Sequence, residues 1–430
     1  MMLRLRSADA DFAARFAALV ADTREPDRGV SGQVAAILER VRKEGFAAVA
    51  ELTQRFDRVE LTAGSAEVGR AERDAAVARV PAEARAALEL AAARIRAFHE
   101  VQRPADGEHA DATGVRAGWR WTAVERAGLY VPGGRAAYPS SVLMNAIPAQ
   151  VAGVDELVMV MPTPDGRLNP LAMLAADLAG VSRIFRIGGA QAIAALAYGT
   201  APVPKCDMIV GPGNAWVAEA KRQLYGTVGI DMVAGPSEIL VIADASARPD
   251  WIAADLLSQA EHDPVAQSIL ITDSPTLADA VADWVERLLP ALSTGEAARE
   301  SWDNYGAIIL VRDLAEAAPL ANALAAEHLE LMLADPKPLF EVVRHAGSIF
   351  LGAHTPEPVG DYIGGPNHVL PTGRRARFSG GLGVHNFLKR TTWLEAGADG
   401  FAALAHATAT LADAEGLPAH ALSIRIRARG

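Results

Sequence analysis

Residues 156–199 read ELVMVMPTPDGRLNPLAMLAADLAGVSRIFRIGGAQAIAALAYG, and this stretch decides the fold. It contains two short apolar runs, 157–161 and 184–187, with the length and composition of buried strands. A segment rich in alanine and leucine, long enough for a helix, follows each run. Strands that alternate with helices in this way predict a mostly parallel, doubly wound sheet with helices on both faces.

The same alternation continues on both sides of this stretch. The other strands of a first set are expected at 208–210 and 239–243, and its helices at 148–152, 170–178, 190–198 and 215–225. A second set begins after residue 244, with strands expected at 268–272, 307–311 and 347–351 and helices at 251–262, 277–289 and 314–326. The sequence therefore predicts two α/β units in tandem.

Both ends of the chain read as helical. Apolar residues recur at helical spacing in 34–56 and in 82–102, ahead of a turn-rich stretch. At the other end, 387–416 is expected to be helical, and a short segment at 420–429 follows it. A long tail after the last compact unit often docks on a partner subunit.

These patterns predict four parts. They are a helical N-terminal segment at 1–120 that packs on the core, a first α/β domain at 121–244, a second α/β domain at 245–380, and a C-terminal tail at 381–430.

Composition favours a small-molecule protein. Half of the 430 residues are apolar, 22% are charged, and the formal net charge is -11. An acidic surface of this kind repels nucleic acid and anionic membranes, so neither is an expected partner. No stretch resembles a signal peptide or is long enough to span a membrane, which makes the cytoplasm the expected location.

Cys206 is the only cysteine, so a disulfide within the chain and a thiolate zinc cluster are both excluded. Two interpretations remain, a buried apolar residue or a nucleophile for an aldehyde intermediate. The neighbouring Asp207 would raise the pKa of the thiol. We therefore favour the buried residue.

Glycine and proline gather in four loops that we place after strands. The loops are Val131-Pro132-Gly133-Gly134, Gly188-Gly189-Ala190-Gln191, Gly211-Pro212-Gly213-Asn214 and Ala234-Gly235-Pro236-Ser237. Open α/β sheets bind ligands at the carboxyl ends of their strands, where glycine lets the backbone approach a phosphate. Any one loop is explained as well by an ordinary turn, but four together favour a ligand site. The usual dinucleotide fingerprint is absent, because Trp216 stands where its third glycine should be.

Two polar pairs stand at expected helix ends. Gln259 and His262 are three residues apart before Pro264, so they share one helix face and could chelate zinc, although ordinary surface polar residues explain them as well. Glu327 and His328 stand at a helix-to-strand junction. A carboxylate beside an imidazole suits acid–base catalysis, and a capped helix end is the alternative.

Two further candidate stretches are less specific. Asp361 and His368 lie in a loop rich in turn residues, which suggests a loop shaped for a ligand but also fits a plain turn. Glu415 and His420 lie among small residues near the end of the chain, and alone they indicate nothing.

Taken together, these segments resemble the histidinol dehydrogenase family. The matching stretches are ERAGLYVPGGRAAYPSSVLMNAIPAQVAGV (125–154), GGAQAIAALAYGT (188–200), IVGPGN (209–214), IDMVAGPSEILVIAD (230–244), AADLLSQAEHDP (253–264), EHLEL (327–331), GDYIGGPNHVLPT (360–372), FLKRT (387–391) and AEGLPAH (414–420). They span nearly the whole chain after residue 120 in the family's order, and long runs are far more specific than a short motif.

The resemblance implies a fold and a reaction. The family is a homodimer with two incomplete Rossmann-like domains, and its tail reaches the partner subunit's site. It binds one Zn²⁺ per subunit and uses NAD to oxidise L-histidinol to L-histidine through the aldehyde. This is the last step of histidine biosynthesis.

The resemblance also implies roles at matching positions. Zinc ligands would be Gln259, His262, Asp361 and His420, and the catalytic pair would be Glu327 and His328. All six would contact the substrate, together with Ser237, His368 and Glu415. NAD contacts would be Tyr130, Gln191 and Asn214. In the implied mechanism zinc anchors the substrate, His328 takes the alcohol proton, and Glu327 activates water.

Some positions depart from the family's commoner pattern. Met208 stands where lysine is frequent, Trp216 stands where tyrosine is frequent, and residues 379–386 are unusual. No chemistry is assigned to these positions, so they bear on fine specificity.

Three rival functions are compatible with the residues. Sulfopropanediol dehydrogenases share the scaffold and oxidise other small alcohols, but they resemble this chain less around 138–149. A zinc hydrolase could use the same ligand types, although no H-E-x-x-H helix is present. A binding protein without catalysis could keep the fold, but every assigned polar position is retained.

Overall fold

The computed structural model describes residues 2–22, 24, 29–133 and 138–429. The chain forms two compact units. The first consists of residues 1–102 and 125–387, and the second of residues 103–124 and 388–430. Among the described residues, no helix combines the length and the apolar character needed to cross a membrane.

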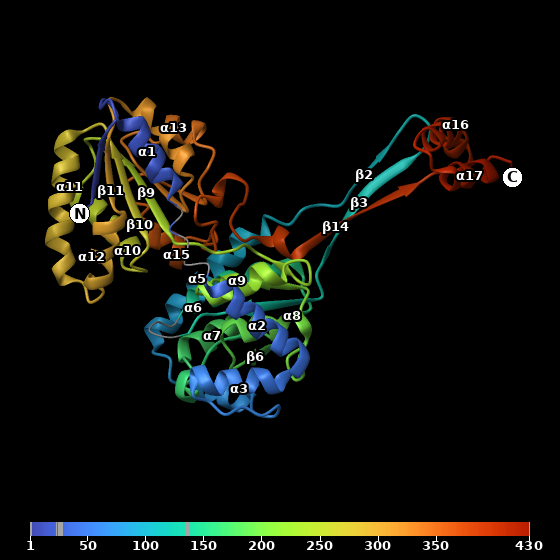
Figure 1. Cartoon of the computed structure of the whole chain (residues 1–430), viewed down its shortest axis with the longest axis horizontal. Helices are drawn as coiled ribbons and strands as arrows, with labels where there is room; N and C mark the ends of the chain where they lie inside the picture. Colours follow the sequence, from blue (N-terminus) through green and yellow to red (C-terminus); the bar gives the residue numbers. More distant parts are fainter. Residues whose placement is uncertain (1, 23, 25–28, 134–137, 430) are drawn as a thin grey trace. The chain divides into compact units, whose positions relative to one another are not determined.

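One six-stranded sheet lies in the first unit, and all of its strands are parallel (Figure 1). Its spatial order is β1 (Leu3–Arg6), β11 (Ala307–Leu310), β10 (Gln267–Thr272), β9 (Glu238–Ala243), β12 (His328–Met332) and β13 (Ser348–Leu351). The central strand β9 is fully buried, as expected for a strand with helices on both sides.

Side chains of β9 alternate between the two faces of this sheet. Leu240 and Ile242 pack against α1 (Phe12–Ala21) and α13 (Ala317–Leu324). Ile239 and Val241 pack on the other side, against the helices α10 (Pro249–Ala260), α11 (Pro275–Leu288) and α12 (Gly295–Tyr305). The two-residue period of a strand thus places one apolar cluster on each face.

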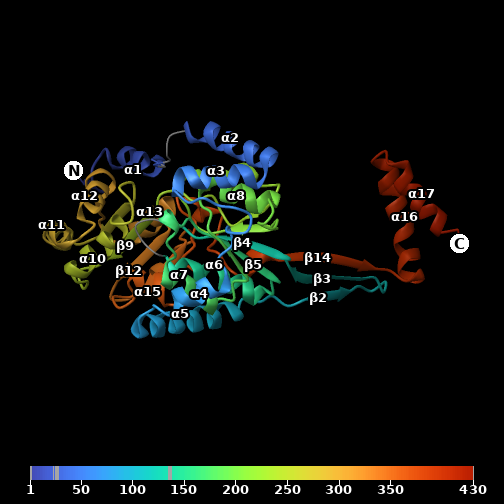
Figure 2. The same ribbon diagram turned by 90° about the horizontal axis from the view of Figure 1, so that it is seen from below.

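The other sheet of the first unit has five parallel strands. Their order is β6 (Arg183–Phe185), β5 (Glu156–Val160), β4 (Arg126–Tyr130), β7 (Met208–Val210) and β8 (Gly229–Ile230). One face is covered by α2 (Gly29–Glu44), α3 (Phe46–Asp57), α8 (Gly189–Tyr198) and α9 (Ala215–Leu224). Figure 2 shows α2, α3 and α8 on one side of the strands and α5 (Ala82–Glu100) on the other. The helices α6 (Pro139–Ala152) and α7 (Pro170–Leu178) pack beside α5.

The predicted α/β class with parallel sheets is confirmed, but several strands lie where the sequence did not place them, and β1 and β9 are two of these. The strand β1 stands inside the stretch expected to be helical, because its LRLR run alternates and pairs with the edge strand β11. The strand β9 lies in the six-stranded sheet, whereas we expected the first domain to extend to residue 244. The loop 231–237 carries the chain from one sheet to the other, and local periodicity does not reveal such a crossing.

Cys206 lies in the apolar cluster between the five-stranded sheet and α8, and it is fully buried. Burial raises the pKa of its thiol to about 12, so the thiolate is not populated near neutral pH. This supports the interpretation of Cys206 as a buried apolar residue.

The second unit begins with an antiparallel sheet of β2 (Gly107–Ala110), β3 (Arg116–Ala123) and β14 (Leu388–Glu395). The expected helix at 387–416 is wrong for its first part, because β14 pairs with β3 along its whole length. Thr391, Thr392 and Trp393 favour a strand. Gly118 makes room for the ring of Trp393, since a Cβ at that position would lie 2.4 Å from Cζ2 of the ring.

Two helices complete the second unit, α16 (Ala398–Ala414) and α17 (Pro418–Arg427). They pack on each other, at the end of the β3–β14 ribbon in Figure 1. Few of their residues are buried, whereas Leu411, Leu422 and Ile426 are more than half exposed at 65%, 55% and 59%. This pair of helices therefore leaves an apolar surface uncovered within its own unit.

Candidate active site

The catalytic candidates lie at the amino end of the six-stranded sheet. Glu327 directly precedes β12 and His328 is its first residue, so both stand at the helix-to-strand junction predicted from the sequence. His328 lies in register with Ile239, which places it beside Glu238 at the start of β9. We expected the glycine loops and their ligand at the carboxyl ends of the strands, and this expectation is wrong for the six-stranded sheet. The loop 234–237 leads into the amino end of β9, because the chain has just crossed from β8.

The hydrogen bonds of His328 fix which ring nitrogen carries the proton. Nδ1 lies 3.2 Å from the carbonyl oxygen of Glu238 and 3.0 Å from Oε1 of Gln259. Oxygens of both kinds only accept, so Nδ1 donates. Nε2 is buried and has no hydrogen-bond partner among the described residues. When the ring is neutral, this arrangement leaves the lone pair of Nε2 unused, and that is the atom at which a general base accepts its proton.

Acidic side chains surround this imidazole. Nε2 lies 3.6 Å from Oδ1 of Asp361 and 4.0 Å from Oε1 of Glu357. Burial disfavours the imidazolium, but the carboxylates of Glu327, Asp361 and Glu357 outweigh burial and raise the pKa of His328 to about 10. The acidic groups around His328 therefore favour positive charge at this position.

Glu327 is buried, and it is held by the strand beside it. Its Oε2 accepts a hydrogen bond from the backbone N–H of Glu238 at 3.1 Å, and lies 3.9 Å from Nδ1 of His328. Burial raises the pKa of Glu327 to about 7, while His328 and the N–H of Glu238 act in the opposite direction. A carboxyl group tuned in this way suits proton transfer.

Gln259 and His262 lie close together, although the helix α10 ends at Ala260 and His262 stands in the turn after it rather than at the end of the expected helix. Gln259 is buried and its Nε2 lies 2.9 Å from Nδ1 of the exposed His262. Asp361 belongs to the short helix α15 (Glu357–Tyr362). Burial alone would raise the pKa of Asp361, but the nearby imidazoles of His328 and His368 lower it to about 2. His368 in turn donates from Nδ1 to the carbonyl oxygen of Asp361 at 2.8 Å.

Glu357 is a site residue that our sequence analysis missed. Its Oε2 accepts a hydrogen bond from Ser258 at 3.1 Å, and the side chain is buried. Burial and the neighbouring Asp361 raise its pKa to about 8. The signal was available, because Glu357 follows Pro356 and stands four residues before Asp361 on one helix face.

One group of side chains has the arrangement of a metal site. Ligand atoms of His328, Glu357 and Asp361 all lie within 4.8 Å of one another. Imidazole nitrogen and carboxylate oxygen are ligands that zinc accepts. Of the expected ligands, this group contains only Asp361, although Gln259 contacts the same imidazole.

The expected NAD contacts lie at the carboxyl edge of the five-stranded sheet. Tyr130 ends β4, and its buried hydroxyl accepts a hydrogen bond from the N–H of Gly189 at 3.2 Å. Gln191 lies in the first turn of α8, and exposed Asn214 caps the N-terminus of α9. Three of the four glycine loops thus stand where we expected them, although Gly134 lies outside the described residues.

The loop Gly211–Asn214 is held by a buried ion pair between Lys221 and Asp231. Lys221 Nζ donates to the carbonyl oxygen of Gly211 at 3.0 Å, and Asp231 Oδ2 accepts from the N–H of Gly211 at 2.8 Å. Gly211 has φ +117°, and a Cβ there would lie 2.1 Å from the carbonyl oxygen of Tyr130. Only glycine fits this position, and the ion pair fixes both of its backbone groups.

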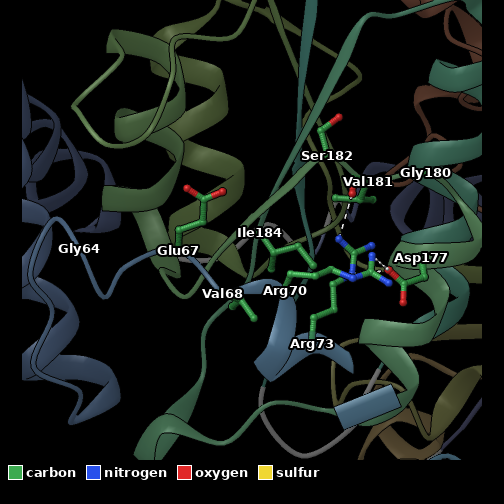
Figure 3. A pocket seen from close by; sticks show the side chains of 11 residues that line it. Gly64, Glu67, Val68, Arg70, Arg73, Asp177, Gly180, Val181, Ser182 and Ile184 are labelled. Carbon is green, nitrogen blue, oxygen red and sulfur yellow. Dashed lines mark hydrogen bonds and ion pairs between the residues drawn. The ribbon is translucent and has the colours of Figure 1, made fainter. Parts of the chain in front are cut away.

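The cavity in Figure 3 is separate from the candidate active site. It has a volume of about 570 Å³ and is lined by Arg70, Arg73, Asp177 and residues at the amino end of β6. Arg73 Nε lies 2.5 Å from Oδ1 of Asp177, so the buried charge there is paired. None of the candidate site residues lines this cavity. Its chemistry gives no reason to place the active site there.

Glu415 and His420 belong to the second unit. Glu415 caps the C-terminus of α16 and His420 lies in the first turn of α17. Both are exposed. The first unit brings together Ser237, Gln259, His262, Glu327, His328, Asp361 and His368, and it contains neither of these two residues.

Comparisons with known proteins agree over the whole chain. The family model for histidinol dehydrogenase matches residues 21–428. The chain belongs to the histidinol dehydrogenase family. Histidinol dehydrogenase from Zymomonas mobilis is 59% identical over 424 residues, and that from Rhodospirillum rubrum is 59% identical over 428 residues, each covering 99% of both chains. The crystal structure of histidinol dehydrogenase from Elizabethkingia anophelis has a TM-score of 0.94 at 33% identity and covers 100% of this chain and 98% of that one.

In this member of the histidinol dehydrogenase family, Lys221→Met should destabilise the fold. The change leaves the Asp231 carboxylate buried without its counter-charge, which costs about 3–5 kcal/mol. The free energy of unfolding from urea denaturation should fall by that amount. In the control, Lys221→Met combined with Asp231→Asn should lose less than Lys221→Met alone. Equal stability of Lys221→Met and the unsubstituted protein would contradict this account of the loop.

Proposed function

We propose that this chain oxidises L-histidinol to L-histidine through the aldehyde, reducing two NAD, as the last step of histidine biosynthesis. The 59% identity to histidinol dehydrogenases over nearly the whole chain carries the proposal. The geometry around His328 supports it independently, because a buried imidazole with a free Nε2 beside a buried carboxyl suits two successive oxidations.

In this proposal the two parallel sheets are two incomplete Rossmann-like units. NAD lies over the carboxyl edge of the five-stranded sheet, in contact with Tyr130, Gln191 and Asn214. The N-terminus of α9 follows the same loop, and helix N-termini favour phosphate. Bound NAD would accept the hydride released in each oxidation.

We assign one zinc per subunit to Gln259, His262 and Asp361, with His420 of the partner subunit as the fourth ligand. The donors fit, since they offer amide oxygen, imidazole nitrogen and carboxylate oxygen. The acidic surroundings of His328 favour a cation as well. We leave His328 out of the set because its Nε2 is the base of the reaction. Redox-inert zinc would hold the imidazole and amine nitrogens of histidinol and so orient the alcohol carbon.

Each acid–base step then belongs to a side chain of this protein. His328 Nε2 takes the hydroxyl proton of histidinol while hydride leaves the alcohol carbon. Glu327 takes a proton from the water that attacks the aldehyde. Once His328 has released its first proton to solvent, it takes the proton of the hydrated aldehyde as the second hydride leaves. Ser237 and His368 contact the substrate. One water enters, two hydrides leave, and the product is a carboxylate.

We further propose a homodimer in which Glu415 and His420 complete the site of the partner subunit. Both residues are exposed and carry no assigned chemistry within their own unit. The exposed leucine and isoleucine side chains of α16 and α17 provide apolar surface for the second copy.

The stoichiometry of NADH tests the proposed reaction. Purified protein with limiting L-histidinol and excess NAD should produce about two NADH per histidinol, because both oxidations occur at one site. A chelator should abolish the absorbance change, and added zinc should restore it. A sulfonated diol that is oxidised in preference to histidinol would favour the other-alcohol rival, and metal-dependent hydrolysis without NADH would favour a hydrolase.

Glu327→Gln should separate the two oxidations. Glutamine keeps the hydrogen bond to the N–H of Glu238 but cannot take a proton from water, so oxidation of the aldehyde should fall by about 10²–10⁴-fold. Oxidation of histidinol to the aldehyde should fall much less. Stopped-flow measurement of each half-reaction gives the comparison, and equal losses would rule out this division of roles.

Mixing inactive variants tests the shared site. Coexpressed Glu327→Gln and His420→Asn chains should regain about a quarter of the normal rate of histidine formation, because half of the randomly formed dimers contain one intact site of two. As a control, Glu327→Gln with His328→Asn should regain none, since both changes strike the same chain's part of the site. Recovery in the control, or none in the test pair, would refute the shared site.

A further inference from the structure

Glu238 touches both catalytic residues through its backbone. Its N–H donates to Oε2 of Glu327 at 3.1 Å, and its carbonyl oxygen accepts from Nδ1 of His328 at 3.2 Å. It is the first residue of β9 and is 1% exposed. The orientation of this one peptide segment therefore determines where the carboxylate and the imidazole point.

The side chain of Glu238 is clamped by two buried arginines. Arg24 Nη2 lies 2.6 Å from its Oε1, and Arg374 Nη1 lies 3.2 Å from the same oxygen. Both arginines are 8% exposed. They come from opposite ends of the first unit's sequence and converge on a single carboxylate.

The same arginines also hold the backbone just before Glu238. Arg24 Nη1 donates to the carbonyl oxygens of Ser237, at 3.3 Å, and Val265, at 2.8 Å. Arg374 Nη2 donates to Oε1 of Gln267 at 2.5 Å, and the N–H of Gln267 donates to the carbonyl oxygen of Ser237 at 3.0 Å. Hydrogen bonds and ion pairs thus hold both the side chain and the main chain at the start of β9.

A buried carboxylate between two guanidinium groups cannot move without exposing unpaired charge, which is costly in an apolar interior. Ion pairs on the surface contribute less, because solvent screens both of their charges. The fixed position of Glu238 also fixes Glu327 and His328, because both are hydrogen-bonded to the backbone of Glu238.

We propose that Glu238 is a positioning residue for the reaction, and that Arg24 and Arg374 hold it so that its backbone sets the His328 tautomer and the direction of the Glu327 carboxylate. The inference rests on the proposed function for the role of the catalytic pair. Nothing in it requires Glu238 to contact substrate, metal or cofactor.

Two variants and one control test this role. Glu238→Gln keeps the shape of the side chain and removes its charge, and Arg374→Lys keeps the charge and loses the forked contacts with Glu238 and Gln267. The control is Arg73→Met, which breaks a buried arginine–carboxylate pair at the amino end of β6 (Figure 3). Thermal unfolding, zinc content, kcat and KM are measured for each protein.

A positioning role predicts that kcat falls while KM and zinc content are unchanged, and a purely structural role does not predict this difference. Both Glu238→Gln and Arg374→Lys should lower kcat by about 10- to 100-fold in both half-reactions, because small displacements of catalytic groups have effects of that size. KM for histidinol and NAD and the zinc content should stay near their normal values. Arg73→Met should lower the unfolding temperature and leave kcat intact. Unchanged kcat in folded Glu238→Gln and Arg374→Lys would overturn the proposal, as would an equal loss of kcat in Arg73→Met.

A crystal structure of the Glu238→Gln protein, or of Arg374→Lys if Glu238→Gln does not fold, gives a second readout that is independent of turnover. His328 Nδ1 should lie beyond hydrogen-bond distance of the residue 238 carbonyl oxygen, or the ring should be rotated. A catalytic pair left in place would overturn the positioning role. Absence of NADH formation by the unsubstituted protein would instead refute the proposed function, and the variant structure would still decide the positioning role.

Discussion

The hydrogen bond from Nδ1 of His328 to the carbonyl oxygen of Glu238 links the proposed catalytic base to the sheet. β9 and β12 are parallel neighbours, and their register puts His328 opposite Ile239, one residue from that carbonyl. The imidazole is therefore oriented by backbone in the centre of a six-stranded sheet rather than by a surface loop. Because a carbonyl oxygen can only accept, the bond also leaves Nε2 as the reactive atom. Changes at either strand would alter both properties at once.

Chain connectivity explains how two different sheet edges serve one function. The chain leaves β8 at the carboxyl edge of the five-stranded sheet and enters β9 at the amino edge of the six-stranded sheet through residues 231–237. Asp231, at the start of this loop, holds Gly211. Glu238, just past its end, holds Glu327 and His328. One short segment thus connects the expected cofactor loop to the catalytic pair.

The sequence predicted the parts that depend on local spacing and missed those that depend on distant pairing. The contact of Gln259 with His262 joins residues three apart at the end of α10, and the βα alternation follows from apolar runs. The strands β1 and β14 gain their hydrogen bonds from partners about 300 and 270 residues away, so their local patterns alone do not determine them. The roles of Arg24 and Arg374 lie beyond any motif, because two segments 350 residues apart meet on one carboxylate.

The charge around His328 argues for the kind of molecule the site receives. Glu327, Glu357 and Asp361 lie within about 4 Å of its ring nitrogens. A second layer follows, in which Glu330 accepts from the N–H of Glu357 at 2.6 Å, and burial with the nearby Asp255 raises the pKa of Glu330 well above its ordinary value. Each carboxylate kept in a buried site raises the free energy of its neighbours unless positive charge enters. A divalent cation and a cationic substrate such as histidinol each supply that charge, whereas an anionic alcohol would add to the repulsion. The electrostatics of the site therefore favour histidinol over a sulfonated diol.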